Sequence, residues 1–174
     1  MTSIRVRRAS VDDALAIAEI HVRSWRAAYQ GLVPDAVLEE LSVEQRERSW
    51  RALLDEAGSS AFTFVAERER RLVGFCSVAT PSRDDDAGAR TCEVAALYVE
   101  PDLRRTGIGG ALLEAALADV RAAGWRSLTL WLLAGNDSAR AFYERFGFAP
   151  DGAEQANERL GRPERRLRAE LGTT

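Results

Sequence analysis

Hydrophobic positions along this chain follow helical spacing in some stretches and form short apolar runs in others. Residues 10–29 follow the helical pattern, with Ser10 as a candidate N-cap and apolar residues every three or four positions, at Ala14, Ile17, Ala18, Val22, Trp25 and Tyr29. After the break GLVP, a second helical region is predicted at residues 34–57. The first third of the chain is therefore expected to be mainly helical.

Apolar runs bounded by turn residues predict the strands. The predicted strands are IRVRR, AFTFVAE, RLVGFCSVA, CEVAALYV and SLTLWLL, and the charged tail PERRLRAEL is a candidate for a last one. The run CEVAALYV shows little polar alternation, so we expect it to be buried on both faces. The stretch PSRDDDAGAR before it is a loop by composition.

The middle of the chain reads as strand, glycine-rich turn, helix, strand. The helix runs to about residue 123, Gly124 is placed to end it in a left-handed conformation, and its buried stripe is Leu112, Leu113, Ala116, Leu117 and Val120. Another helix is predicted at residues 136–145. This order predicts an α/β (α+β) fold, with a mixed, mostly antiparallel sheet flanked by helices in one domain over residues 1–174.

Length and composition fit such a domain. The chain has 174 residues, 46% of them hydrophobic, and no run of 18 apolar residues, so no transmembrane helix is expected. The start MTSIRVRRAS lacks the apolar segment of a secretory signal. A cytoplasmic protein without a membrane partner is the expectation.

Charge and rare residues exclude several function classes. A net charge of −3 argues against nucleic acid as the main partner. The two cysteines, Cys76 and Cys92, lack metal-ligand spacing and are expected to be reduced core thiols. The single histidine, His21, is not enough for a multi-histidine metal site and is expected to be structural or exposed. We therefore expect no metal.

Three glycines open the central helix. Gly107, Gly109 and Gly110 precede a good helical pattern, although glycine is a poor helix former. The first N–H groups of a helix have no helical acceptor and bind anions, and Arg104 and Arg105 add positive charge. This favours a phosphate site; the alternative is a turn needed only for tight strand–helix packing.

Two common phosphate loops do not fit. A nucleotide-hydrolase loop needs lysine and then serine or threonine after its last glycine, where this chain has Ala111 and Leu112. A dinucleotide-binding turn needs GxGxxG, whereas the chain reads GIGGAL. Both classes are excluded by these residues.

The pattern that fits is Arg-x-x-Gly-x-Gly, at Arg104, Gly107 and Gly109. With EVAALYVEPDLRRTGIGGALL before and around it and NDSARAFYERFGF downstream, the region 92–148 resembles the GNAT superfamily of N-acetyltransferases. The N-terminal stretch HVRSWRAAYQGLVPD carries a weaker likeness. The resemblance implies a GNAT-like fold, in which the central strand bulges near its end and splays from the next strand.

The resemblance also implies acetyl-CoA as the cofactor. Its pyrophosphate would lie on the glycine-rich turn, and the backbone of Leu97 and Val99 would pair with the pantetheine arm. The N–H of Leu97 would polarise the thioester carbonyl. The cofactor-binding residues so implied are Leu97, Tyr98, Val99, Arg104, Arg105, Thr106, Gly107, Ile108, Gly109, Gly110, Asn136, Ala139 and Tyr143.

Direct attack of an amine on a thioester needs a neutral amine and a proton for the departing thiolate. By the resemblance, Tyr143 is the general acid, and a buried structural aromatic is the alternative. Glu93 is the candidate base, acting directly or through water; a strand-end carboxylate paired with an arginine is the alternative.

The amine that accepts the acetyl group is expected to bind beside the first two helices. Candidates for the substrate pocket are Trp25, Tyr29, Tyr98 and Trp131, with ordinary helix core as the alternative for the first two. Aromatic walls favour an amine with an apolar or cationic body. The acidic run at Asp84, Asp85 and Asp86 would attract a cationic acceptor or be only a solvated turn.

Two functions from different classes follow. The first is an N-acetyltransferase that moves the acetyl group from acetyl-CoA to a primary amine of a small molecule or a peptide N-terminus. The second is a non-catalytic acyl-CoA-binding sensor, which would need neither Tyr143 nor Glu93. Relatives of this kind often dimerise, so a homodimer is a further expectation. The sequence does not identify the acceptor.

Overall fold

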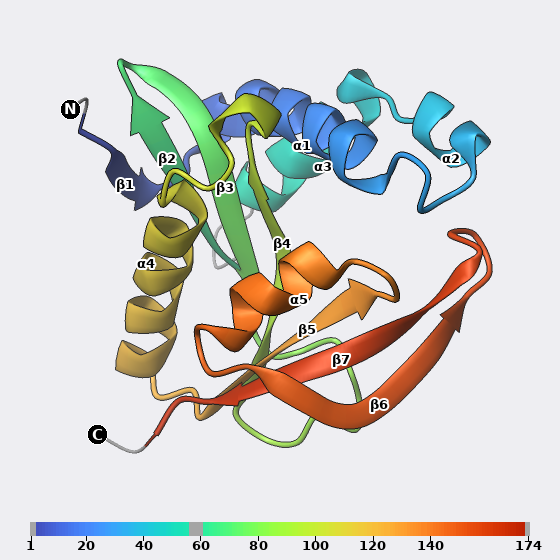
Figure 1. Cartoon of the computed structure of the whole chain (residues 1–174). Helices are drawn as coiled ribbons and strands as arrows, with labels where there is room; N and C mark the ends of the chain where they lie inside the picture. Colours follow the sequence, from blue (N-terminus) through green and yellow to red (C-terminus); the bar gives the residue numbers. More distant parts are fainter. Residues whose placement is uncertain (1–2, 56–60, 173–174) are drawn as a thin grey trace.

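The computed structural model describes residues 3–55 and 61–172. Within these residues, seven strands form one sheet in the order β1-β2-β3-β4-β5-β7-β6 (Figure 1). The strands are β1 Arg5–Arg8, β2 Ala61–Arg68, β3 Arg71–Ala79, β4 Thr91–Val99, β5 Ser127–Leu133, β6 Ala149–Asn157 and β7 Arg162–Glu170. Every neighbouring pair is antiparallel except β4 and β5, which are parallel. The expected mixed, mostly antiparallel sheet is confirmed.

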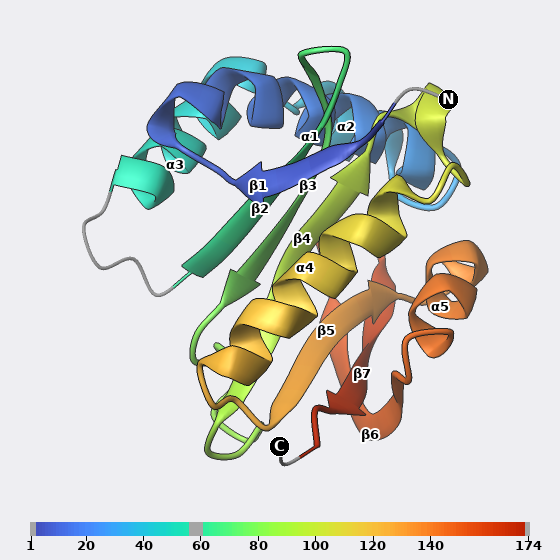
Figure 2. The ribbon, with the colours of Figure 1, turned by 90° about the vertical axis from the view of Figure 1, so that its left-hand side faces the viewer.

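Helices cover both faces of the sheet. They are α1 Ala14–Tyr29, α2 Asp35–Glu39, α3 Val43–Asp55, α4 Ile108–Ala122 and α5 Asp137–Glu144. Helices α4 and α5 pack on one face, around a core that includes Leu112, Leu113 and Tyr143. Helices α1 and α3 pack on the other face of the N-terminal strands, around Ile17, Trp50 and Phe75 (Figure 2).

Two sequence predictions of elements were wrong. The single helical region predicted at residues 34–57 is instead the two helices α2 and α3, separated at residues 40–42, and its expected end at Ala57 lies outside the described residues. Strand β6 was not predicted, because APDGAEQAN has no apolar alternation. It is an edge strand with an irregularity between Pro150 and Glu154, and the edge of a sheet tolerates proline and charge.

Other local predictions are confirmed. The charged tail forms β7, whose Leu167 and Ala169 enter the core while Arg162, Arg166 and Arg168 face the other side. Gly124 has φ +83° and ends α4: its N–H donates to the Arg121 carbonyl, and the Trp125 N–H donates to the Val120 carbonyl. These two bonds satisfy carbonyl groups that a helix end would otherwise leave free.

Gly74 in β3 lies where the N-terminal end of α4 crosses the sheet. A Cβ at this position would lie 3.0 Å from the Tyr98 carbonyl oxygen and 3.1 Å from Leu112 Cδ1. We therefore expect Gly74→Ala to lower the free energy of unfolding by about 1–3 kcal/mol, as overpacked core positions do. Urea unfolding measures this change.

The matched control is Gly109→Ala, because a Cβ there would meet its nearest neighbouring atom at an ordinary 3.5 Å. This variant should unfold at the urea concentration of the original protein or slightly above it. Equal midpoints for the Gly74 and Gly109 variants would show that the β3–α4 contact is not tight.

Candidate functional site

The central strands β4 and β5 separate after a short stretch of pairing. Only Thr91–Glu93 of β4 pair with Ser127–Thr129 of β5, although β4 continues to Val99 and β5 to Leu133. Ala95 adds an extra residue to β4, since Ser77 lies opposite Ala96 and the next residue of β3 lies opposite Val94. A bulge of this kind bends the strand. The bulge and splay implied by the resemblance are therefore confirmed.

The backbone of β4 faces this gap at alternate residues. The Glu100 N–H donates to the Val73 carbonyl across the β3–β4 ladder. Because hydrogen-bonded pairs alternate along an antiparallel ladder, the backbone groups of Leu97 and Val99 point away from β3. The Val99 carbonyl also accepts a 3.0 Å hydrogen bond from the Ser24 hydroxyl on α1. The Leu97 N–H and carbonyl thus face the space between the splayed strands.

Helix α4 begins at the open end of the gap. Gly107 is its N-cap with φ +89° and has no side chain to cap the helix. Arg105 also has a positive φ of 62°. The side chains of Arg104, Arg105 and Thr106 are exposed, and the Arg104 guanidinium approaches the Ser24 carbonyl at 3.4 Å. The first-turn N–H groups therefore lie at an exposed surface next to two cations, which is the arrangement of an anion site.

Two of the glycines serve packing as well. A Cβ on Gly109 would point toward the Phe142 ring at 3.5 Å and toward Leu97, and one on Gly110 would lie 3.3 Å from Phe146. These aromatic residues lie on or just after α5. The packing interpretation of the turn therefore applies to Gly109 and Gly110, which let α5 approach, and Gly107 supplies the left-handed backbone conformation. Ile108 is buried in the core between them.

Helix α5 lies beside the gap on the same face as α4. The Asn136 side chain caps it, with Oδ1 accepting from the Ala139 N–H at 3.3 Å. Tyr143 is 7% exposed and packs edge-on against Phe142 and Phe148, with ring centroids 5.0 and 5.5 Å away. Burial raises the pKa of Tyr143 well above its ordinary value. The phenol therefore keeps its proton throughout the neutral range.

Glu93 is the last residue of β4 that pairs with β5, and it lies opposite Thr129. Its side chain is 3% exposed, and both carboxylate oxygens accept hydrogen bonds from Arg83, from Nη2 at 2.5 Å and from Nε at 3.2 Å. The Arg83 backbone N–H also donates to Oε2. Glu93 is thus a buried carboxylate at the point where the strands part, and it pairs with an arginine as the alternative interpretation expected; the sequence did not identify Arg83 as this partner.

Three of the four predicted pocket residues lie together. Trp25 packs edge-on against Tyr29 at 4.8 Å, and His21 contacts both Trp25 and Tyr98. Burial raises the pKa of both Tyr29 and Tyr98. The Trp25 side chain interacts with Tyr98. Among the described residues, however, no group accepts a hydrogen bond of regular geometry from the buried Trp25 N–H. This aromatic cluster joins α1 to β4.

Trp131 belongs to a different group. Its indole N–H donates to Asp84 at 2.9 Å, and the Arg166 guanidinium lies 5.5 Å from its ring. Arg166 is 5% exposed and also pairs with Asp86 at 2.6 Å and Asp151 at 2.7 Å. Asp84 and Asp86 of the acidic run thus bind Arg166 and are not free to attract a cationic acceptor, although Asp85 and Asp86 are exposed to solvent. This network holds the β3–β4 loop against β5 and β7.

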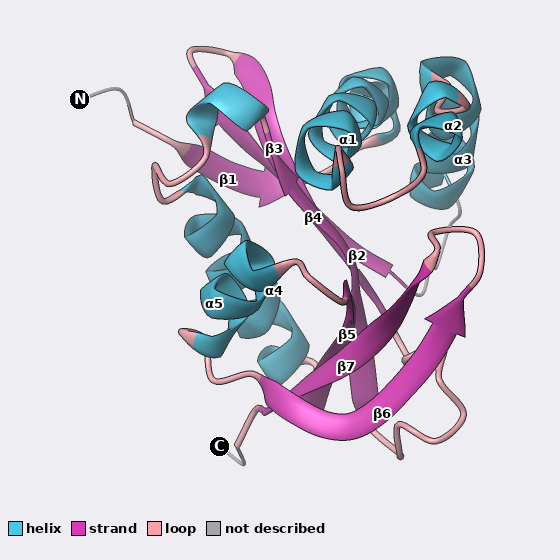
Figure 3. Ribbon diagram, turned by 45° about the vertical axis from the view of Figure 1, so that its right-hand side comes forward, coloured by secondary structure: helices cyan, strands magenta, loops and turns pink. Residues whose placement is uncertain are grey.

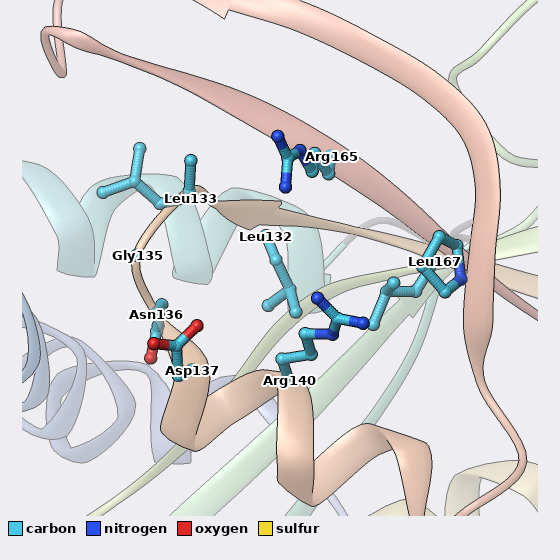
Figure 4. A pocket seen from close by; sticks show the side chains of 10 residues that line it. Leu132, Leu133, Gly135, Asn136, Asp137, Arg140, Arg165 and Leu167 are labelled. Atoms are coloured by element: carbon cyan, nitrogen blue, oxygen red, sulfur yellow. The ribbon is translucent and has the colours of Figure 1, made fainter.

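The described residues line at least two cavities. A small one of about 50 Å³ lies between the end of β5, the start of α5 and β7 (Figure 4). Asn136 and Asp137 line one side of it, and Arg140 and Arg165 point toward it from α5 and β7. Its volume suits about one or two waters. The second cavity, of about 220 Å³, lies on the α3 side of the molecule.

Other candidate chemistry can be located as well. Cys76 and Cys92 are free and buried, and burial raises the pKa of each thiol to about 12. Within residues 3–55 and 61–172, no group of three or more His, Cys, Asp or Glu side chains is placed to hold a metal ion. In the same residues, no helix is long and apolar enough to cross a membrane.

Residues 16–148 match the model of the acetyltransferase (GNAT) family. This span is more than half of the chain, and it contains the splayed strands, the glycine-rich turn and α5. The chain belongs to the GNAT family of acetyltransferases.

Individual relatives agree with this assignment. This GNAT chain is 32% identical over 161 residues to the uncharacterized N-acetyltransferase YuaI of Bacillus subtilis, covering 90% of this chain and 88% of YuaI. Its fold is similar to that of the PaiA N-acetyltransferase of Thermoplasma acidophilum in complex with coenzyme A, with a TM-score of 0.81 and 20% identity over 97% of this chain and 99% of that one. The ribosomal-protein-alanine N-acetyltransferase of Brucella melitensis is 25% identical with a TM-score of 0.75, covering 95% and 99% of the two chains.

His21 stabilises the aromatic cluster of this GNAT chain only while it is neutral. The Trp50 indole N–H donates to its Nδ1 at 3.2 Å, and burial together with the nearby positive charge of Arg46 lowers its pKa to about 3. Between pH 6.5 and 3 the unfolded chain binds a proton at His21 that the folded chain does not. The stability that His21 contributes is therefore complete above pH 6.5 and decreases as the pH falls through this window.

We expect His21→Gln, whose amide oxygen also accepts from Trp50, to lack this pH dependence. The difference in unfolding free energy between the original protein and the variant should change by about 2 kcal/mol between pH 7.5 and pH 5, with the original losing more. Urea unfolding at the two pH values measures it. A constant difference would show that folded His21 takes up a proton as readily as an exposed histidine.

Proposed function

We propose that the protein transfers an acetyl group from acetyl-CoA to a primary amine of a small molecule or a peptide N-terminus. The observation that carries this proposal is the position of the uncapped α4 N-terminus at the mouth of the gap between β4 and β5. A helix N-terminus can bind phosphate. The unpaired edge of β4 in the gap can pair with an extended amide chain. Acetyl-CoA combines both chemical groups and supplies the activated acetyl group.

The residues at the gap have the chemistry to hold it. The α4 first-turn N–H groups, with Arg104 and Arg105, would bind the pyrophosphate. The outward backbone groups of Leu97 and Val99 would pair with the pantetheine arm, and the Leu97 N–H is the candidate donor to the reacting carbonyl oxygen. The Val99 carbonyl can still accept a bond beside that from Ser24, because a carbonyl oxygen has two lone pairs.

The side chains of Tyr143 and Glu93 would carry out the two proton transfers. Tyr143 lies beside the gap and stays protonated at neutral pH, so it is the candidate donor to the departing thiolate. Glu93 is the candidate acceptor of the amine proton, directly or through water, because it lies where the strands part. Its bonds to Arg83 would hold the carboxylate in place for this role.

The charge of the glycine-rich turn gives a direct test. Arg105→Glu reverses a charge beside the proposed pyrophosphate site on an exposed side chain. We expect acetyl-CoA and CoA to bind the original protein saturably and to bind this variant roughly tenfold or more weakly, a loss of about 1.4 kcal/mol. Calorimetric titration measures both affinities.

Arg90→Glu is the matched control. Arg90 is also exposed, has a similar φ of 59° and lies at the other end of β4, so the variant carries the same charge change and the same backbone conformation. Its affinity for CoA should be unchanged. Absence of acetyl-CoA binding by the original protein, or equal binding of ATP and NAD, would contradict the proposed cofactor.

The candidate acid gives a second test. Tyr143→Phe removes only the hydroxyl from a packed ring, so we expect CoA affinity to be retained while kcat for acetylation falls about 100-fold, the usual size of a lost acid–base contribution. Initial rates of CoA release with an amine panel measure it. An unchanged kcat would remove Tyr143 as the acid.

Glu93→Gln, measured in the same assay, separates the two proton transfers. Without a base, the amine must lose its proton to bulk solvent first, so the rate deficit of this variant should shrink as the pH rises, whereas that of Tyr143→Phe should not. Binding of acetyl-CoA without acetylation of any amine would favour a sensor over an enzyme.

A further inference from the structure

A polar cavity of about 220 Å³ lies beside the aromatic cluster of His21, Trp25, Tyr29 and Tyr98. None of its lining residues belongs to the proposed acetyl-CoA site. Helix α3 and the residues before it line one side, and the turn between β6 and β7 contributes Arg159 on the other. The cavity is open to solvent, since Glu40, Gln45, Ser49 and Arg159 of its polar lining are exposed and Ser42 and Arg46 are half-buried. The volume is enough for a small organic group, since a water occupies about 30 Å³.

Two guanidinium groups line this cavity without a carboxylate partner. Among the described residues, no Asp or Glu lies within ion-pair distance of Arg46 or Arg159, whereas Arg83 and Arg166 are fully paired. Glu40 also lines the cavity, but it is exposed and pairs with neither arginine. Arg46 is half-buried, and burial together with the charge of Arg159 lowers its pKa. Two like charges held near each other are a site for an anion.

The turn that carries the exposed Arg159 is anchored by its neighbours. The next residue, Leu160, is buried in a cluster with Val37 and Leu38 of α2. The Arg162 guanidinium donates to the Leu32 carbonyl at 2.8 Å. The β6–β7 turn is therefore anchored to the α1–α2 region, as its place in Figure 3 indicates, and it holds Arg159 near α3.

The cavity adjoins the acceptor side of the gap. The Arg46 guanidinium lies 5.9 Å from the Trp25 ring centroid, and Trp25 contacts His21, which stacks on Tyr98 at 5.1 Å. Tyr98 is the β4 residue between Leu97 and Val99, whose backbone groups face the gap. A continuous row of contacts thus joins Arg46 to the strand at which acetyl transfer is proposed.

We propose that Arg46 and Arg159 bind an anionic group, a carboxylate or a phosphonate or phosphate, on the amine acceptor. The inference rests on the proposed acetyl transfer and narrows its acceptor to an amino compound with a separate negative charge. Guanidinium groups bind such anions through paired N–H donors, and Ser42 and Gln45 add neutral donors. The same two charges disfavour a polyamine, so the cationic acceptor that the acidic loop suggested is not the one proposed.

Matched amines test the inference in two ways. In the first, protein with excess CoA is titrated with 2-aminoethylphosphonate against ethanolamine, and with 4-aminobutanoate against 4-aminobutanamide. The anionic member of at least one pair should bind about tenfold more tightly, and Arg46→Gln and Arg159→Gln should each remove most of that preference. The two pairs distinguish a phosphonate from a carboxylate.

Arg48→Gln is the matched control, because Arg48 lies exposed on the same helix and does not line the cavity. It should keep the full preference. Equal binding of both members of each pair, or a preference that survives both cavity substitutions, would overturn the anion site. The binding titration needs no turnover, so it remains decisive if the protein acetylates none of these amines.

The second test follows acetylation of the same pairs of anionic and neutral amines. The anionic amine should have a kcat/KM about tenfold higher, and the two substitutions should raise the KM of the anionic amine several-fold more than that of the neutral amine. Faster acetylation of the neutral amines would show that the cavity does not serve the acceptor. Loss of acetylation with every amine would instead contradict the proposed function.

Discussion

The separation of β4 from β5 is the constraint on which the rest of this structure depends. Each strand is paired along its length with another neighbour, β4 with β3 and β5 with β7, and the two share only the pairs from Thr91 to Glu93. Because sheets twist, two half-sheets joined over so short a stretch diverge beyond it. The bulge at Ala95 bends β4 just beyond the last of these pairs. The unpaired backbone of β4 follows directly from this arrangement.

Side-chain packing on the two faces maintains the gap. On one face, Phe142 and Phe146 of the α5 region fit against the glycines at the start of α4, so the helix N-terminus and α5 form the two sides of one opening. On the other face, α1 reaches β4 through Ser24 and the aromatic cluster. The site is thus a property of the packing of four elements rather than of any one motif.

Charge is distributed unevenly around this opening. On the β5–β7 side, carboxylates of the β3–β4 loop neutralise Arg166, and Arg83 pairs with Glu93, so these charges hold the loop in place. At the glycine-rich turn and at the α3 cavity, arginines lack such partners among the described residues. The paired charges contribute structure, and the unpaired ones have the chemistry for ligands. An acceptor with its own negative charge would complete this pattern.

The sequence by itself determined the elements with strong local signals and the motif by which the family is recognised. Helical periodicity, apolar strands, the end of α4 at Gly124 and the motif from Arg104 to Gly109 all depend on neighbouring residues, so they can be recognised without a structure. Strand β6 could not be recognised, because an edge strand with proline and charges owes its conformation to pairing with β7. The tertiary structure decided the pairing of Glu93 with Arg83, the separation of Trp131 from the other aromatic residues, and the placement of Arg46 and Arg159 beside one cavity. These are placements of side chains far apart in the sequence, and no local pattern encodes which of them come together.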